Sequence, residues 1–281
     1  MKTFLEKLLF PDAAVNKARL TDTIAGKTIV ITGASYGIGR ELALLFSAYK
    51  VHLVIIARTE DKLREVAATV TKNGSACRVV AADLYQESGV ELVIETLNSL
   101  PGGIDLFISN AGKSITRPLA QSLDRYHDFT RTNALNYLAP VRMLLAATPL
   151  LNLGGQIINV SALNVLLLPA PTWAAYQASK TAFDQWMRSN LAEWKIMGIA
   201  AKTIYLPLVR TRMITPTERY KNQPTMQPEQ AAIRVAKLIY IKGNYSKPWW
   251  AVFAQTASFL SKSLWEKLSF FRLNKRSSRD T

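Results

Sequence analysis

Tyr176 and Lys180 form the pair of residues whose types and spacing suit acid–base chemistry. They stand four positions apart in a stretch that we expect to be helical, so both side chains lie on one face, one turn apart. A free tyrosine has a pKa of about 10, too high for proton transfer at neutral pH. A neighbouring ammonium favours the phenolate and lowers that pKa, so the pair predicts a tyrosine that exchanges a proton with a substrate. Because this spacing is frequent by chance, the prediction depends on the rest of the chain.

A glycine-rich turn near the start of the chain has the spacing that binds the phosphates of a dinucleotide. The segment 32–39, TGASYGIG, follows the apolar run 28–31 and precedes the helical pattern of 40–46. In such a turn the first glycine allows the bend, the second admits a pyrophosphate, and the third lets helix and strand pack closely. The helix also offers free amides and a positive dipole end to phosphate. The contacts expected from this turn come from Gly33, Ser35, Tyr36, Gly37, Ile38 and Gly39.

The residue after the second predicted strand indicates which nicotinamide cofactor binds. NAD-binding folds place an acid about 20 residues beyond the glycine turn, where it bonds the ribose hydroxyls. In this chain the strand ends at Ala57, and Arg58 stands in that place. A guanidinium can bind a ribose 2′-phosphate bidentately, whereas a carboxylate repels it. We therefore predict NADP(H) as the cofactor, with Arg58 as the discriminating residue and Ser35 as a second donor.

With these motifs in place, the sequence from about 26 to 213 resembles the short-chain dehydrogenase/reductase (SDR) family. The resemblance rests on segment 32–39, Asp83-Leu84, Ser109-Asn110-Ala111-Gly112, Asn136, and Tyr176 with Lys180. It implies hydride exchange between C4 of the nicotinamide and a carbonyl or alcohol carbon, with Tyr176 donating the proton in reduction. It further implies that Lys180 lowers the tyrosine pKa and holds the nicotinamide ribose, and that Asn136 anchors a water in a proton relay. A homodimer or homotetramer is also implied.

The same resemblance assigns the remaining cofactor contacts. Asp83 is expected at the adenine, and Asn110 and Ala111 beside the adenosine ribose. Thr211 is expected to hold the nicotinamide carboxamide. The other cofactor-binding residues implied are Leu84, Gly112 and Val209.

The chain departs from the family pattern at the end of the fifth predicted strand. The family usually has two serines there, and the second stabilises the substrate oxygen. This chain reads Ser161-Ala162, with Ala162 in the usual serine position and a following loop that looks one residue longer. A shift of register would bring Ser161 into the site; otherwise one hydrogen-bond donor is missing. A second departure is Leu206-Pro207 in place of the usual Pro-Gly.

Apolar runs and helical patterns alternate along the chain, which predicts an α/β fold. Because each predicted strand is apolar throughout, we expect a single doubly wound Rossmann-like domain with a mostly parallel sheet covered by helices on both faces. The predicted strands are 28–31, 51–57, 77–82, 104–108, 156–160 and 200–205, and the predicted helices after the glycine turn are 61–72, 87–100, 121–150 and 173–197.

We expect this domain to span residues 25–245, preceded by an amphipathic helix and linker at 1–24 and followed by an extension at 246–281. In the first helix Phe4, Leu5, Leu8 and Leu9 share a face, which is expected to pack on the domain, with a membrane as the alternative. The extension mixes aromatic and basic residues. It is either a helix docked on its own domain with a solvated basic tail, or an interfacial helix that contacts a membrane.

The segments 211–217 and 227–232 are similar to those of bacterial SDR-type long-chain fatty acyl-CoA reductases. With residues 212–230 as a loop over the substrate, they favour reduction of an apolar carbonyl substrate, fatty acyl or aldehyde-like. Three alternatives remain. The first is a ketone or alcohol oxidoreductase for a steroid-like or other small molecule, and the second is an NADP(H)-binding protein with little turnover, which Ala162 favours. The third is a peripheral membrane or acyl-carrier docking protein, which the net charge and the C-terminal extension favour.

Composition limits the partners. The net charge of +15 fits nucleotides, acyl thioesters or an anionic membrane surface, and we expect no nucleic-acid partner because no such module is present. A single cysteine, Cys77, and two distant histidines predict no metal site and a reducing compartment. No apolar run reaches the ~20 residues of a membrane span. We expect a cytoplasmic protein, with a place at the inner face of a membrane as the alternative.

Overall fold

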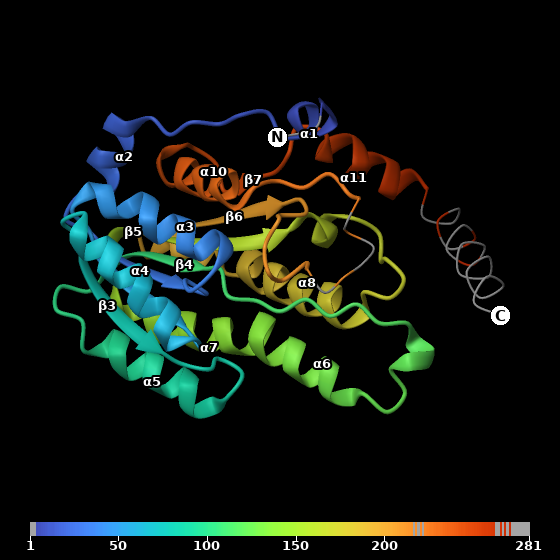
Figure 1. Cartoon of the computed structure of the whole chain (residues 1–281), viewed down its shortest axis with the longest axis horizontal. Coiled ribbons are helices and arrows are strands. Elements are labelled where there is room, and N and C mark those ends of the chain that lie inside the picture. Colours follow the sequence, from blue (N-terminus) through green and yellow to red (C-terminus); the bar gives the residue numbers. More distant parts are fainter. Residues whose placement is uncertain are drawn as a thin grey trace.

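A computed structural model of the chain describes residues 4–215, 217, 220, 222–261, 265, 267 and 270. In this part of the chain, seven strands form one sheet in the order β3-β2-β1-β4-β5-β6-β7, and each neighbouring pair is parallel (Figure 1). The strands are β1 (Thr28–Thr32), β2 (His52–Ala57), β3 (Ala76–Ala81), β4 (Ile104–Ser109), β5 (Leu151–Ala162), β6 (Ala200–Leu206) and β7 (Tyr245–Ser246).

Helices cover both faces of the sheet and bury two separate hydrophobic clusters. Side chains at Ile29, Ile31 and Ile55 pack with the helices of one face, and those at Val30 and Phe107 pack with the helices of the other. This two-sided burial explains why the strands are apolar throughout and confirms the predicted doubly wound fold. The first face carries α2 (Lys17–Ile24), α3 (Gly37–Phe46), α4 (Glu60–Lys72) and α10 (Pro228–Tyr240); the second carries α5 (Glu87–Asn98), α7 (Ala139–Ala147), α8 (Ala174–Ser189) and α9 (Leu191–Ile196).

Several elements differ from the sequence prediction. The predicted linker contains helix α2, which Asn16 caps by accepting a hydrogen bond from the Arg19 amide at 3.0 Å. The short edge strand β7 was not predicted. The predicted helix 121–150 is divided into α6 (Tyr126–Asn133), a π-helical turn η3 (Ala134–Leu138), α7 and the 3-10 turn η4 (Thr148–Leu150). Short 3-10 turns also occur at η1 (Ser47–Tyr49), η2 (Leu119–Gln121) and η5 (Leu163–Leu166).

The N-terminal helix α1 (Phe4–Leu9) docks with the face opposite to the predicted one. Glu6 is buried, whereas Phe4, Leu5 and Leu8 are exposed. The expected burial of the apolar face is therefore wrong for these three residues. Hydrogen bonds explain which side of α1 is buried, because the Glu6 carboxylate accepts from the amide and hydroxyl of Thr225, at 3.1 and 3.3 Å.

Helix α11 (Ala251–Leu260) lies beside α1, so elements from the two ends of the chain are neighbours (Figure 1). Among the described residues, no helix is both long and apolar enough to cross a membrane. The division into segments 1–24, 25–245 and 246–281 stays a prediction.

Candidate active site

Tyr176 lies in the first turn of α8 within an aromatic group. Its ring packs edge-on against Trp173, with 5.6 Å between ring centroids, and Trp173 in turn lies 5.7 Å from Tyr220. Burial raises the pKa of Tyr176, and Tyr220 raises it further. The lowered pKa expected from Lys180 is therefore not found in this structure, because burial removes the hydration that a phenolate needs. Tyr176 is held as the protonated phenol, the form that donates a proton.

Lys180 lies one turn further along α8 and is buried. Its Nζ donates a hydrogen bond to the carbonyl oxygen of Val160 at 3.4 Å, which joins α8 to the carboxyl end of β5. Burial lowers the pKa of Lys180 to about 8. The amine is thus charged at neutral pH but loses its proton in mildly alkaline solution.

Asn136 occupies the π-helical turn η3, a kind of turn that is frequent at functional sites. Its amide oxygen accepts from the Lys113 amide at 2.8 Å, and its Nδ2 donates to the Lys113 carbonyl at 2.9 Å and to the Ser179 hydroxyl at 3.0 Å. A Cβ at Gly112 would lie 3.2 Å from Asn136 Oδ1 and 3.4 Å from Lys180 Nζ. The structure therefore brings Asn136 and Lys180 together beside Gly112. Lys113 and Ser179 were not predicted from the sequence. Lys113 bonds Asn136 through its backbone amide and carbonyl, which leave no signal in the residue type.

The register of β5 determines where Ser161 points. Ser161 pairs with Tyr205 of β6, whose hydroxyl donates to Asp184 of α8 at 2.8 Å. Paired residues in neighbouring strands lie on the same face of a sheet, so Ser161 faces α8, whereas Ala162 pairs with Leu206 on the other face. The Ser161 hydroxyl is buried and has no hydrogen-bond partner among the described residues.

The loop between β5 and α8 is fixed by Gln177, the residue after Tyr176. Its Nε2 donates to the Asn164 carbonyl at 2.7 Å, and its Oε1 accepts from the Ala170 amide at 2.9 Å. At the end of the loop, Thr172 has a φ of 73°, an unfavourable region for a β-branched residue. Arg117 holds it there by donating from its amide to the Thr172 carbonyl at 2.8 Å. Neither Gln177 nor Thr172 was identified from the sequence: Gln177 bonds backbone groups, and the Thr172 hydroxyl lies 3.0 Å from that of Thr116, 56 positions earlier.

The glycine turn has the geometry of a phosphate cradle. Gly33 and Gly37 have φ values of 71° and 55°, and a Cβ at Gly39 would lie 2.3 Å from the Gly33 carbonyl oxygen. Any side chain at position 39 would therefore force the backbone to move. Helix α3 begins after Tyr36 without a side-chain cap, so its first amides point toward the turn. These features fit the pyrophosphate of a dinucleotide.

The end of β4 is joined to this turn through Thr32 and Asn110. The Thr32 hydroxyl accepts from the amides of Asn110 and Ala111, at 2.9 and 3.0 Å. Asn110 Nδ2 donates to the Thr32 carbonyl at 3.0 Å. These bonds hold the β4 end against the glycine turn. Thr32 was part of the quoted motif but was not predicted as a site residue.

The predicted adenosine end of the site lies at the ends of β2 and β3. Arg58 is exposed, and its Nη1 lies 3.7 Å from the Asp83 carboxylate, so the two charges occupy one edge of the sheet. Asp83 also accepts a hydrogen bond from the Tyr85 amide at 3.2 Å. Leu84 and Ser35 are buried. Leu84 packs in the core, so its side chain is less accessible to a cofactor than the Asp83 carboxylate is.

The segment after β6 covers the glycine turn and is clamped at its base. A Cβ at Gly37 would lie 2.9 Å from Thr211 Cγ2, and the Arg212 guanidinium lies 5.0 Å from the centre of the Tyr36 ring. Val209 pairs with Met226 in an isolated β-bridge, which closes the loop 209–226 at its base. We name residues 209–226 the covering loop.

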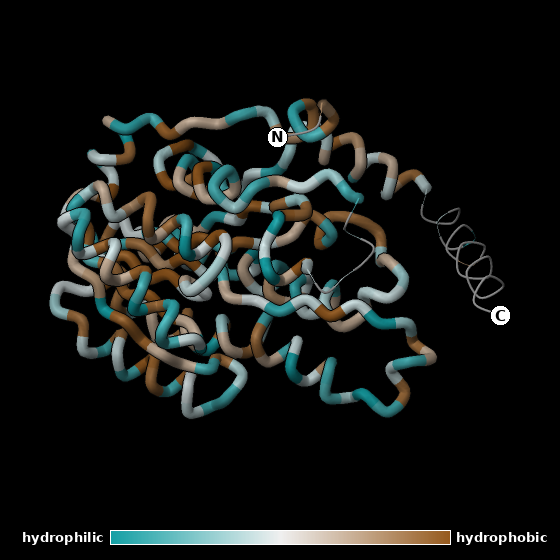
Figure 2. The backbone as a smooth tube through the Cα atoms, in the orientation of Figure 1, coloured by the Kyte–Doolittle hydropathy of each residue, from teal (hydrophilic) through white to brown (hydrophobic). Residues whose placement is uncertain are grey.

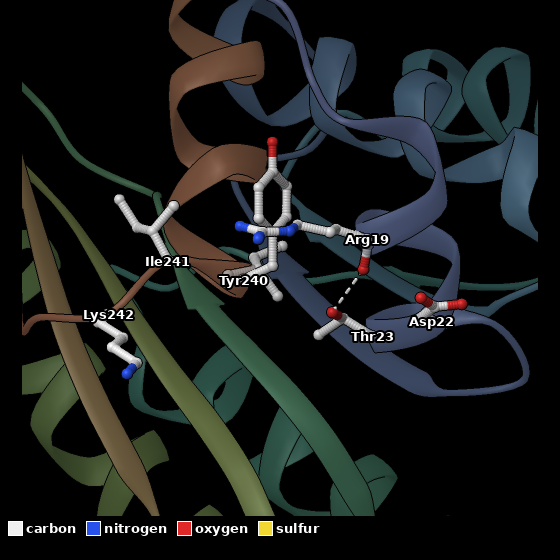
Figure 3. Close-up of a pocket in the computed structure, with 7 residues that line it drawn as sticks. Arg19, Asp22, Thr23, Tyr240, Ile241 and Lys242 are labelled. Carbon is white, nitrogen blue, oxygen red and sulfur yellow. Dashed lines mark hydrogen bonds between the residues drawn. The ribbon is translucent and has the colours of Figure 1, made fainter.

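An open cleft between α2 and the end of α10 lies away from these residues (Figure 3). Arg19 and Asp22 of α2 and Tyr240 to Lys242 line it, and the Thr23 hydroxyl donates to the Arg19 carbonyl at 2.7 Å. None of the predicted site residues lines this cleft, and it is not part of the candidate site.

The Rossmann-type sheet, its glycine turn and the cluster of Tyr176, Lys180 and Asn136 are features of a dinucleotide-dependent oxidoreductase. The family described as short chain dehydrogenase matches residues 27–222, and this chain belongs to that family.

Two relatives are similar over most of the chain. A fatty acyl-CoA reductase of Acinetobacter baylyi is 39% identical over 218 residues, which are 77% of this chain and 74% of the relative. A fatty acyl-CoA reductase of Mycobacterium tuberculosis is 38% identical over 225 residues, which are 79% and 76% of the two chains.

Among solved structures, the L-sorbose reductase of Gluconobacter frateurii in complex with NADPH and L-sorbose is similar, with a TM-score of 0.70 and 26% identity. The match covers 80% of this chain and 95% of that one. Several further structures with this fold contain NADP, which agrees with the predicted cofactor class.

Proposed function

We propose that this protein is an NADPH-dependent reductase of an apolar carbonyl substrate, a fatty acyl thioester or a long-chain aldehyde. The observation that carries the proposal is the cluster of protonated Tyr176, buried Lys180 and Asn136 at the carboxyl end of β5, beside the glycine turn. The similarity to two fatty acyl-CoA reductases supports the substrate class.

Apolar side chains near the site also support an apolar substrate. The loop after β5 carries Val165, Leu166 and Leu167, which pack on the cluster that contains Leu163 and Tyr205. Trp173 lies against Tyr176 itself. This apolar surrounding favours a hydrocarbon chain over a sugar or another polar molecule, because burying hydroxyl groups there without partners would be costly.

When bound in the cradle, NADPH would supply the hydride for the carbonyl carbon. Tyr176 donates its phenolic proton to the carbonyl oxygen as charge develops there. Ser161, which faces α8 and has an unpartnered hydroxyl, donates a hydrogen bond to the same oxygen. Charged Lys180 stabilises the phenolate that remains, and Asn136, held by Lys113 and Ser179, supports the route by which the proton is replaced.

We propose that Arg58 contacts the 2′-phosphate of NADPH, since it is exposed at the edge where a ribose phosphate would lie. Asp83, Asn110, Ala111, Gly112, Val209 and Thr211 are proposed as the remaining cofactor contacts. An assembly of two or four copies is likewise a proposal.

The test is NADPH oxidation with a panel of medium- and long-chain acyl-CoAs, aldehydes and simple ketones, comparing the natural chain with Tyr176→Phe. We expect turnover with long apolar carbonyl substrates and its loss in the variant, while NADPH still binds. Turnover of small ketones alone would refute the substrate class. Equal turnover by both proteins would refute the role of Tyr176.

A further inference from the structure

Helices α1 and α11 come from opposite ends of the chain and are joined by two indole groups. Trp250 Nε1 donates to the Leu9 carbonyl at 3.2 Å, and Trp249 Nε1 donates to the Leu8 carbonyl at 3.4 Å. Both acceptors belong to the last turn of α1, so the start of α11 covers the end of α1 (Figure 1). The two helices therefore form one structural unit.

This unit exposes large apolar side chains along both helices, and both helices include hydrophobic segments, drawn brown in Figure 2. Phe4 is 84% exposed, Phe253 69% and Phe259 85%. In α11 only Ala251 is buried among the described residues. Such a patch is more than the scattered apolar residues that a soluble surface normally carries. We name it the end-helix surface; it consists of Phe4, Leu5, Leu8, Trp249, Val252, Phe253, Phe259 and Leu260.

The end-helix surface is connected to both loops that border the candidate site. Through Glu6, α1 holds Thr225 and Arg210 at the base of the covering loop. Beyond α11, Trp265 Nε1 donates to the Pro169 carbonyl at 2.9 Å in the loop between β5 and α8. A body that contacts this surface would therefore lie next to elements that hold both of these loops.

Positive charge accompanies the apolar residues. Lys7 of α1 is exposed, as are Lys247, just before α11, and Lys267, beyond its end. In the sequence, residues 246–281 contain seven basic residues and only two acidic ones, and the whole chain carries +15. Apolar side chains surrounded by lysine and arginine are complementary to a bilayer with anionic headgroups.

We propose that the end-helix surface binds anionic phospholipid bilayers and places the two loops that border the candidate site next to the lipid. Membrane binding would allow a substrate dissolved in the bilayer to reach the site, and this use of the contact rests on the proposed function. The binding of the bilayer does not depend on that function. Phe4, Leu8, Phe253 and Phe259 enter the headgroup region, and the lysines contact phosphate.

The experiment is co-sedimentation of the full chain with vesicles of phosphatidylcholine alone and of equal amounts of phosphatidylcholine and phosphatidylglycerol, without substrate or NADPH. One variant carries Phe4→Ser with Leu8→Ser, and another carries Phe253→Ser with Phe259→Ser. The matched control carries Leu153→Ser with Ile196→Ser, because these residues are 90% and 86% exposed but lie outside both helices.

We expect the natural chain and the control to bind the anionic vesicles, and each end-helix variant to bind about tenfold more weakly. All four proteins should reduce a water-soluble aldehyde at the same rate, if the proposed function holds. Absence of binding to anionic vesicles would overturn the proposal, even if the enzyme is active. So would equal weakening in the control, or a change in oligomeric state of the end-helix variants without any vesicle binding. Loss of reductase activity with intact, variant-sensitive vesicle binding would instead count against the proposed function alone.

Discussion

Ser161 and Ala162 are neighbours at the end of β5 but face opposite sides of the sheet. Because side chains alternate along a strand, only Ser161 shares a face with α8 and Tyr176. Its hydroxyl is buried without a partner among the described residues, which costs free energy unless a substrate oxygen completes the hydrogen bond. We therefore propose that Ser161 supplies the donor that the family has at the position of Ala162.

Replacing this hydroxyl should separate activity from stability. We expect Ser161→Ala to lower kcat by about 100- to 1000-fold, because a donor to the developing oxyanion is lost. The urea midpoint should be unchanged or slightly higher, since no hydrogen bond within the protein is removed. Steady-state kinetics and urea unfolding measure the two effects, with Ala162→Ser as the control. A drop in stability with normal kcat would show that the hydroxyl is structural.

The lowered pKa of Lys180 predicts how activity depends on pH. Below pH 8 the Lys180 amine is charged and is expected to support proton transfer by Tyr176. Above pH 8 Lys180 loses this charge, whereas Tyr176 stays protonated because its pKa is raised. We expect kcat/KM for carbonyl reduction to be constant up to a pH near 8 and then to fall about tenfold per unit.

A pH–rate profile with a saturating cofactor concentration measures this fall. Lys202→Met is a matched control, because Lys202 is also a buried lysine with a lowered pKa but contacts the carbonyls at the end of α10 instead of the site. The control should keep the break near pH 8. A rate that stays constant to pH 10 in the natural protein would contradict the role given to charged Lys180.

Cofactor choice is expected to depend on a single guanidinium. Arg58→Asp should lower the ratio of kcat/KM for NADPH over NADH by about 10- to 100-fold, because a charge-assisted contact to the 2′-phosphate becomes a repulsion. Arg64→Asp is the control: it is an equally exposed arginine of α4 that pairs with Glu60. An unchanged ratio in Arg58→Asp would show that another residue selects the cofactor.

Helix α1 holds the base of the covering loop through Glu6. Its only buried charged residue among those described, Glu6, accepts two hydrogen bonds from Thr225 and lies 3.4 Å from the Arg210 guanidinium. The buried carboxylate is stable there because these donors replace its water. This arrangement also explains why the apolar face of α1 points outward.

Removing the carboxylate should loosen the loop without disturbing the sheet. For Glu6→Ala we expect trypsin to cleave at Arg210 or Arg212 at least about tenfold faster, since a buried amide loses its acceptor. Glu6→Gln, which keeps an acceptor oxygen, should show a smaller increase. Limited proteolysis followed by mass spectrometry measures the cleavage. Equal rates in all three proteins would mean that α1 does not restrain the loop.

Considered as a whole, the molecule follows its sequence where a pattern is local and departs from it where a distant partner decides. Strands β1 to β6 were predicted because each contains a short apolar run, and the glycine turn was predicted because its spacing is specific. Helix α2 was missed because few of its residues are apolar. It docks by burying Leu20 and Ile24, and the Tyr240 hydroxyl, from a distant helix, accepts from the Asn16 amide at 2.9 Å. Likewise, β7 pairs only two residues with a strand about 40 positions earlier.

The candidate site shows the same division. The residue types and their order predicted Tyr176, Lys180 and Asn136, which the structure brings to one region. The direction of the Tyr176 pKa could not be predicted, because it depends on burial by Trp173 and the covering loop. The outward face of α1 was also beyond reach, since it follows from a carboxylate bonding residues more than 200 positions away.

That separation along the chain also sets an order of events during synthesis. Glu6 is made early, but its partner Thr225 follows 219 residues later, and Trp250 follows Leu9 by 241. While the chain grows, the Rossmann strands can pair with partners already made, whereas α1 stays undocked and its aromatic residue faces whatever surrounds the ribosome. The covering loop therefore reaches its final form only after Thr225 has been translated and α1 has docked.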